Sequence, residues 1–175
     1  MTIHDSQLSL ATHLQSIKPP WSVLLVLKAG QRAESVVKVP DGFLLKVVRG
    51  GKCRSATALF AEVADTLEFP DYFGHNWDAL EECLADLEWF PAKGYVLLFT
   101  DAELILPDDE EEFATFLEVL NDAGEAWASG QAAKRARPFH SVLAVSERNK
   151  SKRTHWGLPQ VAVSAPRPSR RKRSL

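Results

Sequence analysis

Short apolar segments alternate with longer amphipathic segments from residue 43 onward, and this alternation constrains the fold more than any other feature of the sequence. The apolar segments have the length of β-strands and span residues 43–48, 95–99 and 141–145. The amphipathic segments have helical spacing and begin near Thr57, Asn76 and Asp108. Parallel strands must be joined by a crossover, which is usually a helix. The sequence therefore predicts an α/β fold in which a small parallel sheet is flanked by helices.

The first 42 residues follow a different pattern. Apolar residues at helical spacing predict a helix over residues 6–17, which two prolines then end. Two short apolar segments, 22–27 and 36–39, flank a glycine turn and predict a β-hairpin. We therefore expect an N-terminal extension made of a helix and a hairpin.

The formal net charge of −2 is an average over unlike parts of the chain. Between Glu62 and Glu125 the sequence contains 19 acidic residues and one basic residue, Lys93. Residues 148–175 contain nine lysines or arginines and no acidic residue, and their composition predicts a disordered tail. The expected organisation is an N-terminal extension over 1–42, a domain over 43–147, and a basic tail over 148–175.

This charge distribution indicates which partners the chain can bind. An acidic surface repels nucleic acid and attracts basic proteins. We therefore do not expect the domain to bind nucleic acid. The basic tail could contact nucleic acid without sequence specificity, although such tails more often bind weakly to many anionic surfaces.

Several other classes of protein are excluded by simple patterns. The longest purely aliphatic or aromatic run, Val23 to Leu27, is five residues and far too short to cross a membrane. The N-terminus lacks a basic segment followed by an apolar one, so we expect a cytoplasmic protein with Cys53 and Cys83 as free thiols. No nucleophile–base or metal-ligand spacing occurs, so we expect no enzymatic activity, no cofactor and no metal.

The segment from Leu67 to Leu84 is the most distinctive in the chain. At about 100° per residue, Asp78 and Glu82 lie on one face of a helix. The opposite face carries the apolar residues Trp77, Leu80, Cys83, Leu84 and Leu87. Such an acidic face is most often simply solvated. Here aromatic residues precede it and further acidic residues follow it, which is typical of a pocket that binds guanidinium or ammonium groups.

The same segment resembles the barstar family of intracellular inhibitors of the secreted ribonuclease barnase. The family hallmark, Pro-x-Tyr-Tyr/Phe-Gly-x-Asn-x-Asp-Ala-Leu-x-Asp-Cys-Leu, is matched here by Pro70, Tyr72, Phe73, Gly74, Asn76, Asp78, Ala79, Leu80, Glu82, Cys83 and Leu84. The resemblance extends upstream to about Leu44 and, more loosely, downstream to Val145, with residues 128–138 as an insertion. It implies a three-stranded parallel sheet flanked by helices, in agreement with the order of elements above.

The resemblance also implies a function. Members of this family occlude a ribonuclease active site with carboxylates that take the places of RNA phosphates. The implied partner is a basic ribonuclease of the barnase type or a related toxin, bound by a monomer of this chain. Carried over residue by residue, the partner-binding residues are Tyr72, Asn76, Asp78, Glu81, Glu82, Asp86, Leu87, Glu88, Trp89 and Asp122.

Two positions depart from the family pattern and leave an alternative open. The central interface aspartate of the family is Glu82 here, and the interfacial tryptophan before it is Glu81. The first change lengthens the side chain, and the second replaces an aromatic anchor with a charge. The alternative is a non-inhibitory interaction module that keeps the fold and binds another basic protein.

Overall fold

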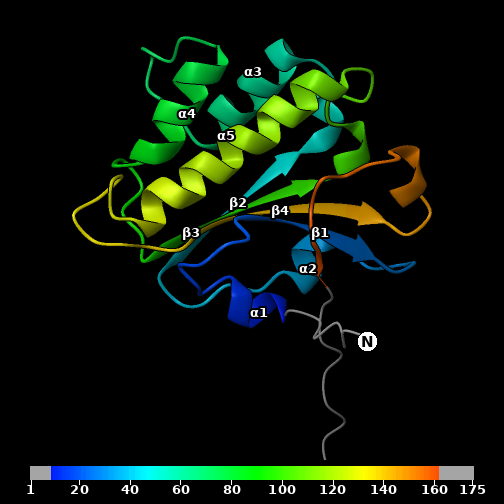
Figure 1. Ribbon diagram of the computed structural model, residues 1–175, viewed down its shortest axis with the longest axis horizontal. Helices are drawn as coiled ribbons and strands as arrows, with labels where there is room; N and C mark the ends of the chain where they lie inside the picture. The colour runs from blue at the N-terminus through cyan, green and yellow to red at the C-terminus, as the bar shows by residue number, and fades with distance from the viewer. Residues whose placement is uncertain (1–8, 162–175) are drawn as a thin grey trace, which may run out of the picture.

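The computed structural model describes residues 9–161, which form a five-stranded, entirely parallel sheet with helices on both faces (Figure 1). The strand order is β2-β3-β4-β1-β5. The strands are β1 (Ser22–Leu27), β2 (Phe43–Arg49), β3 (Gly94–Thr100), β4 (Phe139–Ser146) and β5 (Gln160–Val161). The predicted α/β class with a parallel, helix-flanked sheet is confirmed, but the sheet has five strands and not three.

Three helices cover the upper face of the sheet (Figure 1). They are α3 (Ala56–Thr66), α4 (Trp77–Asp86) and α5 (Glu110–Ala128). The first and last of them begin with a side-chain cap, because the side chains of Ser55 and Asp109 accept hydrogen bonds from backbone N–H groups three residues later. Acidic residues fill the first turn of α5, where they interact favourably with the helix dipole. Aromatic side chains such as Phe99 and Phe116, which meet edge to face, fill the core below these helices.

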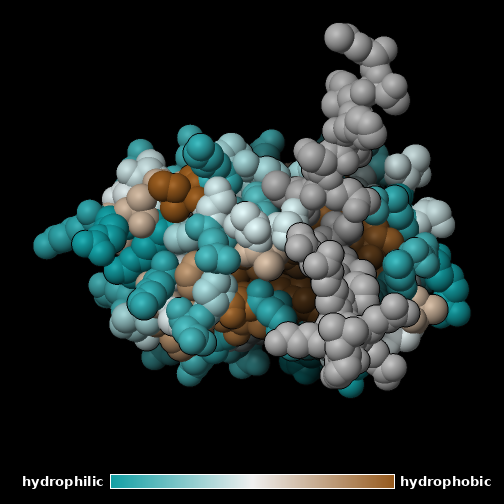
Figure 2. Space-filling model, turned by 90° about the horizontal axis from the view of Figure 1, so that it is seen from below, coloured by the Kyte–Doolittle hydropathy of each residue, from teal (hydrophilic) through white to brown (hydrophobic). Residues whose placement is uncertain are grey.

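The lower face is covered more thinly, by the four-residue helices α1 (Leu10–His13) and α2 (Ala33–Val36) and by extended chain. Their buried residues form a second, smaller core with the lower side of the sheet. Apolar side chains are visible on this face (Figure 2), and several residues packed against the second core are only partly buried, among them Val36, Val39, Leu45 and Val47.

The direction of each connection along the sheet decides which face it covers. The connection from β1 to β2 runs one way and passes below the sheet, whereas those from β2 to β3, β3 to β4 and β4 to β5 run the other way and pass above it (Figure 1). Crossovers between parallel strands are right-handed, so connections in opposite directions must lie on opposite faces. After the neighbouring strands β1 and β4, the chain therefore continues on opposite faces of the sheet, below it after β1 and above it after β4.

The predicted N-terminal hairpin is wrong. Strand β1 pairs in parallel with β4, from Ser22 opposite Ser141 to Leu27 opposite Ser146. Residues 36–39 form no strand, because Val36 ends α2 and the side chain of Val37 is buried in the lower core. The apolar residues of β1 alternate between the two cores and bury both of its faces, which is typical of a parallel interior strand.

The prediction of a disordered tail is also wrong for residues 148–161. These residues include the 3₁₀ turn η3 (Lys150–Lys152) and the short strand β5, which pairs with β1. Residues 162–175 lie outside the described part of the chain, as do the first residues of the predicted helix over 6–17. Within the described residues that prediction is too long, because only Leu10–His13 is helical and turns and bends follow. The division at residues 42 and 147 remains a prediction, although the sheet takes strands from both sides of each boundary.

Arg153 holds the C-terminal segment against the upper core. Its guanidinium donates hydrogen bonds to Oε1 of Glu110 at 2.7 Å and to the carbonyl of Ile105 at 2.7 Å. It also lies 3.6 Å from the ring centre of Phe113, beside the buried indole of Trp156. Burial lowers the pKa of Arg153, and the nearby Glu110 carboxylate opposes that shift.

Removing the Arg153 side chain should destabilise the fold. We expect Arg153→Met to lower the free energy of unfolding by about 1–3 kcal/mol, because buried carbonyls lose their donor. Urea denaturation measures the difference. The matched control is Arg148→Met at an exposed position, which should change the value by less than about 0.5 kcal/mol. Equal stability of the two variants would contradict this account of the segment.

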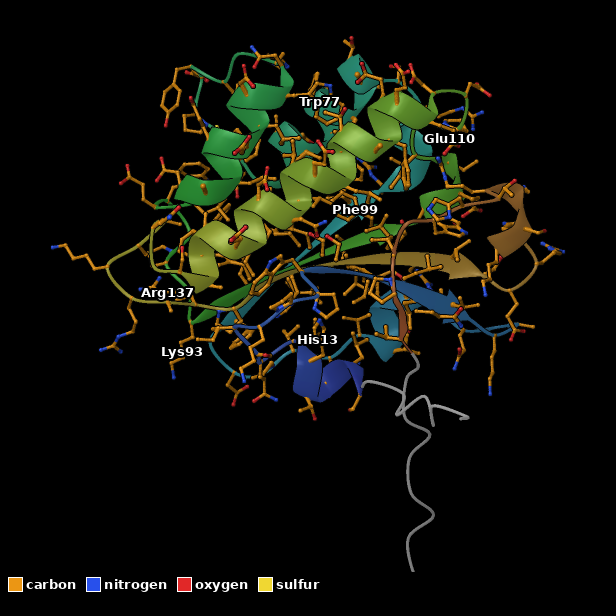
Figure 3. All side chains as sticks on the ribbon, in the orientation of Figure 1. His13, Trp77, Lys93, Phe99, Glu110 and Arg137 are labelled. Atoms are coloured by element: carbon orange, nitrogen blue, oxygen red, sulfur yellow. The ribbon has the colours of Figure 1, made fainter. Side chains whose placement is uncertain are left out.

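Two histidines are buried between the sheet and the N-terminal segment. The rings of His13 and His140 lie 4.5 Å apart, and Figure 3 shows His13 between α1 and the sheet. The Nε2 atoms are 2.7 Å from the Pro20 carbonyl for His13 and 2.6 Å from the Ser16 carbonyl for His140. Burial lowers the pKa of both, and lowers that of His140 from 6.5 to about 4.

This pair should make the fold less stable in acid. The folded protein keeps His140 neutral down to about pH 4, whereas the unfolded chain takes up its proton near pH 6.5. The free energy of unfolding should therefore fall by roughly 3 kcal/mol as the pH drops through this window, through His140 alone. Urea denaturation of the wild type and of His140→Gln, whose amide can still donate to Ser16, isolates this contribution. The variant should lose less stability across the window, and identical pH profiles would contradict the prediction.

Candidate partner-binding site

Helix α4 carries four of the ten residues predicted to bind a partner, and its start is fixed by Asn76. The side-chain oxygen of Asn76 accepts a hydrogen bond from the Ala79 N–H at 2.8 Å, and its Nδ2 donates to the Gly74 carbonyl at 3.3 Å. Asn76 is therefore the N-cap of α4, at the residue where the sequence predicts that a helix begins. Both the oxygen and the nitrogen of the exposed Asn76 amide are thus hydrogen-bonded to nearby backbone, and these bonds fix where α4 begins.

Two indole hydrogen bonds hold α4 against α5. Nε1 of Trp77 donates to Oε2 of Glu112 at 2.7 Å, and Nε1 of Trp127 donates to the Leu84 carbonyl at 2.8 Å. Figure 3 shows Trp77 between the two helices. Because these bonds tie each helix to the other at separate points, α4 presents its outer face from a fixed position.

The outer face of α4 is acidic, and it forms no ion pair with the part of the chain that the structure describes. Asp78, Glu81 and Glu82 are exposed, and Asp86 is half-buried. The ion pairs within residues 9–161 involve none of them. These carboxylates are therefore available to basic groups of another molecule, and no salt bridge within this part of the chain must break first.

Asp122 of α5 lies close enough to the acidic face of α4 to affect its charges. Partial burial raises the pKa of the Glu81 carboxyl, and the charges of Asp122, Asp78 and Glu82 raise it further. Asp122, the predicted partner-binding carboxylate of α5, thus repels the charge of Glu81 on α4. An open hollow of about 730 Å³ extends from this face, and it is lined by Asp78, Glu81, Glu82, Ala85, Asp86, Ala126, Gln131 and Ala132.

A second open hollow, of about 660 Å³, lies at the end of α4. Tyr72 is 73% exposed on its rim, and desolvation and the charges of Asp86 and Glu88 raise the pKa of its phenol. Trp89 is held in place because its indole N–H donates to the Leu67 carbonyl at 2.9 Å. This hollow is lined by Glu68, Pro70, Tyr72, Glu88, Trp89 and Phe90.

Leu87 is a predicted partner-binding residue, but its side chain is not accessible to a partner. The side chain is fully buried in the upper core. Its backbone has φ of 44°, in the left-handed region, and closes α4 by donating to the Cys83 carbonyl. Leu87 therefore shapes the turn that leads to Glu88 and Trp89 and cannot reach a partner through its side chain.

Sequence reasoning missed the residues that the predicted insertion contributes to the first hollow. Gln131 and Ala132 belong to residues 128–138 and form part of its lining. The gap in the resemblance indicated an insertion, but no local pattern showed that it folds back toward α4. The backbone N–H of Arg137 donates to the Trp127 carbonyl at 3.0 Å and closes this loop (Figure 3).

The two cysteines of the chain are both buried, and Cys83 lies on the inner side of α4. Cys53 and Cys83 are free, buried thiols, and burial raises the pKa of Cys53 to about 12. Residues 9–161 contain no group of three or more His, Cys, Asp or Glu side chains arranged to hold a metal ion. Helices in the described part of the chain are too short or too polar to span a bilayer.

Comparison with known proteins places this site in a family context. The family model for Barstar (barnase inhibitor) matches residues 43–144, which include α4, its flanking loops and α5. A search of curated proteins gave no match.

Mutual repulsion of the carboxylates on the outer face of α4 should destabilise the folded protein. We expect Glu81→Gln to raise the free energy of unfolding at pH 7 by a few tenths of a kcal/mol, because it removes a charge that Asp122, Asp78 and Glu82 disfavour. The gain should shrink as salt is added. Thermal denaturation at two salt concentrations measures it, with Asp41→Asn in the exposed turn before β2 as the control. A loss of stability in Glu81→Gln alone would contradict the repulsion.

Proposed function

Because the family model matches more than half of its length, this chain belongs to the barstar family, and we propose that it is a protein inhibitor of a barnase-type ribonuclease. In this proposal the chain binds the basic active site of the enzyme and occludes it, and performs no chemistry itself. The observation that carries the proposal is the fixed carboxylate face of α4, which forms no ion pair with any residue in 9–161 and is adjoined by Asp122 of α5.

The carboxylates suit the task of replacing RNA phosphates. A ribonuclease must hold a phosphodiester with cationic side chains, and carboxylates accept hydrogen bonds from the same arginines and lysines. Asp78 and Glu82 point outward from a helix that is already anchored by Trp77 and Trp127. Little ordering is then required on binding, which favours affinity.

The wider charge distribution supports fast association. The stretch from Glu62 to Glu125 contains 19 acidic residues and one basic residue. Such a surface attracts a basic enzyme over several ångströms and raises the rate of encounter, most strongly at low salt.

Glu81 and Glu82 bear on which ribonuclease is the target. Glu82 is one methylene longer than the family aspartate, and Glu81 places a carboxylate in the hollow where the family carries a tryptophan. A cognate enzyme should therefore present an additional basic group opposite Glu81 and Asp122, in place of a surface that stacks on an indole.

A second candidate function keeps the same surface but changes the partner. The alternative is a non-inhibitory module that binds another basic protein, and the observations that favour it are the charge at Glu81 and the hollow wall supplied by Gln131 and Ala132. In both proposals we place the protein in the cytoplasm as a monomer that binds one partner.

Alanine substitutions on α4 test the inhibitor proposal. We expect the wild type to inhibit RNA cleavage by a barnase-type ribonuclease, and Asp78→Ala and Glu82→Ala each to weaken inhibition by at least about tenfold, because each removes an acceptor for a buried cation. Inhibition constants from a fluorogenic RNA substrate measure the effect. Glu118→Ala, on the exposed side of α5, is the matched control and should inhibit like the wild type.

Salt provides a second measurement on the same proteins. The association rate constant should fall as ionic strength rises, and should fall less steeply for the Asp78→Ala/Glu82→Ala double variant. If no barnase-type enzyme is inhibited, or if neither substitution alters inhibition, the inhibitor proposal is wrong and the interaction module is favoured.

A further inference from the structure

The carboxyl ends of β1 and β4 form a second place where a ligand could bind. After Leu27 the chain turns below the sheet to α2, and after Ser146 it turns above the sheet toward η3 (Figure 1). Two neighbouring parallel strands whose chains diverge to opposite faces leave a crevice between them. In open α/β sheets, ligands bind in the crevice outside the carboxyl ends of the strands at this switch point.

The structure has two hollows at this point. One has a volume of about 360 Å³ and the other of about 300 Å³, each within the range of roughly 300–1,000 Å³ found for small-molecule sites. Leu27, Gln31 and Ser146 line both, so the hollows are adjacent and together follow the ends of β1 and β4. They share no residue with the hollows beside α4.

The first hollow is suited to an anionic group. Lys28 and Arg148 line it from the ends of β1 and β4, and neither forms an ion pair in the part of the chain that the structure describes. Glu147 is its one acidic lining residue. Gly30 forms its turn with φ of 80°, and a Cβ at that position would meet no atom within 4 Å, so a ligand can approach the backbone there.

The second hollow is suited to hydroxyl groups. Thr100 and Asp101, at the end of β3, line it together with Glu34 of α2 and one basic residue, Arg32. Carboxylates in this position accept hydrogen bonds from ligand hydroxyls, as the acidic residue that binds a ribose does in other open α/β folds. The backbone of Asp101 lies in the left-handed region, with φ of 46°.

We propose that this crevice binds a mononucleotide, with its phosphate between Lys28 and Arg148 and its ribose hydroxyls at Asp101 and Glu34. Inorganic phosphate offers only the first set of contacts, and a nucleoside offers only the second. The basic pair, Lys28 and Arg148, at one end of the crevice and the acidic pair, Asp101 and Glu34, at the other therefore favour a ligand that carries both groups. This inference is independent of the proposed inhibitor function, since it uses neither α4 nor α5.

Titration of the full chain tests the proposal. Backbone amide NMR spectra would be followed as AMP, ribose 5-phosphate, inorganic phosphate and adenosine are added separately. We expect AMP and ribose 5-phosphate to shift the signals of Gly30 and Arg148 in a saturable way, with phosphate and adenosine each at least about tenfold weaker. Mapping the shifted residues separates binding in the crevice from binding elsewhere on this basic-tailed chain.

Three variants make the outcome specific. Arg148→Ala should weaken AMP and inorganic phosphate by a similar factor, about fivefold or more, because it removes a charged donor. Asp101→Asn, whose side chain also tolerates the left-handed backbone, should weaken AMP and leave inorganic phosphate unchanged. The charge-matched control is Lys134→Ala, which should bind like the wild type. Lys134 lies in the exposed loop before β4, at the amino end of that strand and not at its carboxyl end.

Several results would overturn the proposal. These are no saturable shift at Gly30 or Arg148 with AMP, equal affinity for AMP and inorganic phosphate, or equal weakening in Lys134→Ala and Arg148→Ala. Asp78→Ala should leave AMP binding unchanged, and Arg148→Ala should leave ribonuclease inhibition unchanged. The crevice and the inhibitor proposals can thus fail separately.

Discussion

The parallel pairing of β1 with β4 is the constraint on which the rest of the structure depends. It places the first strand of the chain between β4 and β5 and obliges the connection to β2 to pass below the sheet, because crossovers are right-handed. All three long helices then lie on the upper face, where α4 can pack on α5 and turn its carboxylates outward. The crevice at the ends of β1 and β4 results from the same pairing.

Local patterns predicted the elements that local chemistry decides. The strands at residues 43–48, 95–99 and 141–145 and the helices that begin near Asn76 and Asp108 follow from residues close in sequence, and the structure contains each of them. The partner of β1 could not be predicted this way, because β4 lies more than a hundred residues away and nothing in β1 specifies it. The short apolar run at residues 36–39 matched a hairpin pattern that long-range pairing overrides.

Average properties of a segment concealed individual anchors. The basic composition after residue 147 predicted disorder, whereas Arg153 and Trp156 pack against α5 and residues 160–161 pair with β1. Helical periodicity had already grouped Leu87 with the apolar face of α4, and the resemblance alone assigned it to the partner-binding site. Its burial shows that the physical pattern was the better guide at that position. The wall formed by Gln131 and Ala132 had no signal in the sequence, because it depends on how a loop closes.

Helix α4 keeps its structural residues and its proposed recognition residues on opposite faces. Its inner side chains and the two indole bonds attach it to the core, while Asp78, Glu81 and Glu82 make no ion pair with the rest of the described chain. Substitutions on the outer face can therefore accumulate without passing through unfolded intermediates. Residues on this face can therefore be replaced one at a time, as a partner changes, without loss of the fold. The departures from the family pattern at Glu81 and Glu82 are substitutions of this kind.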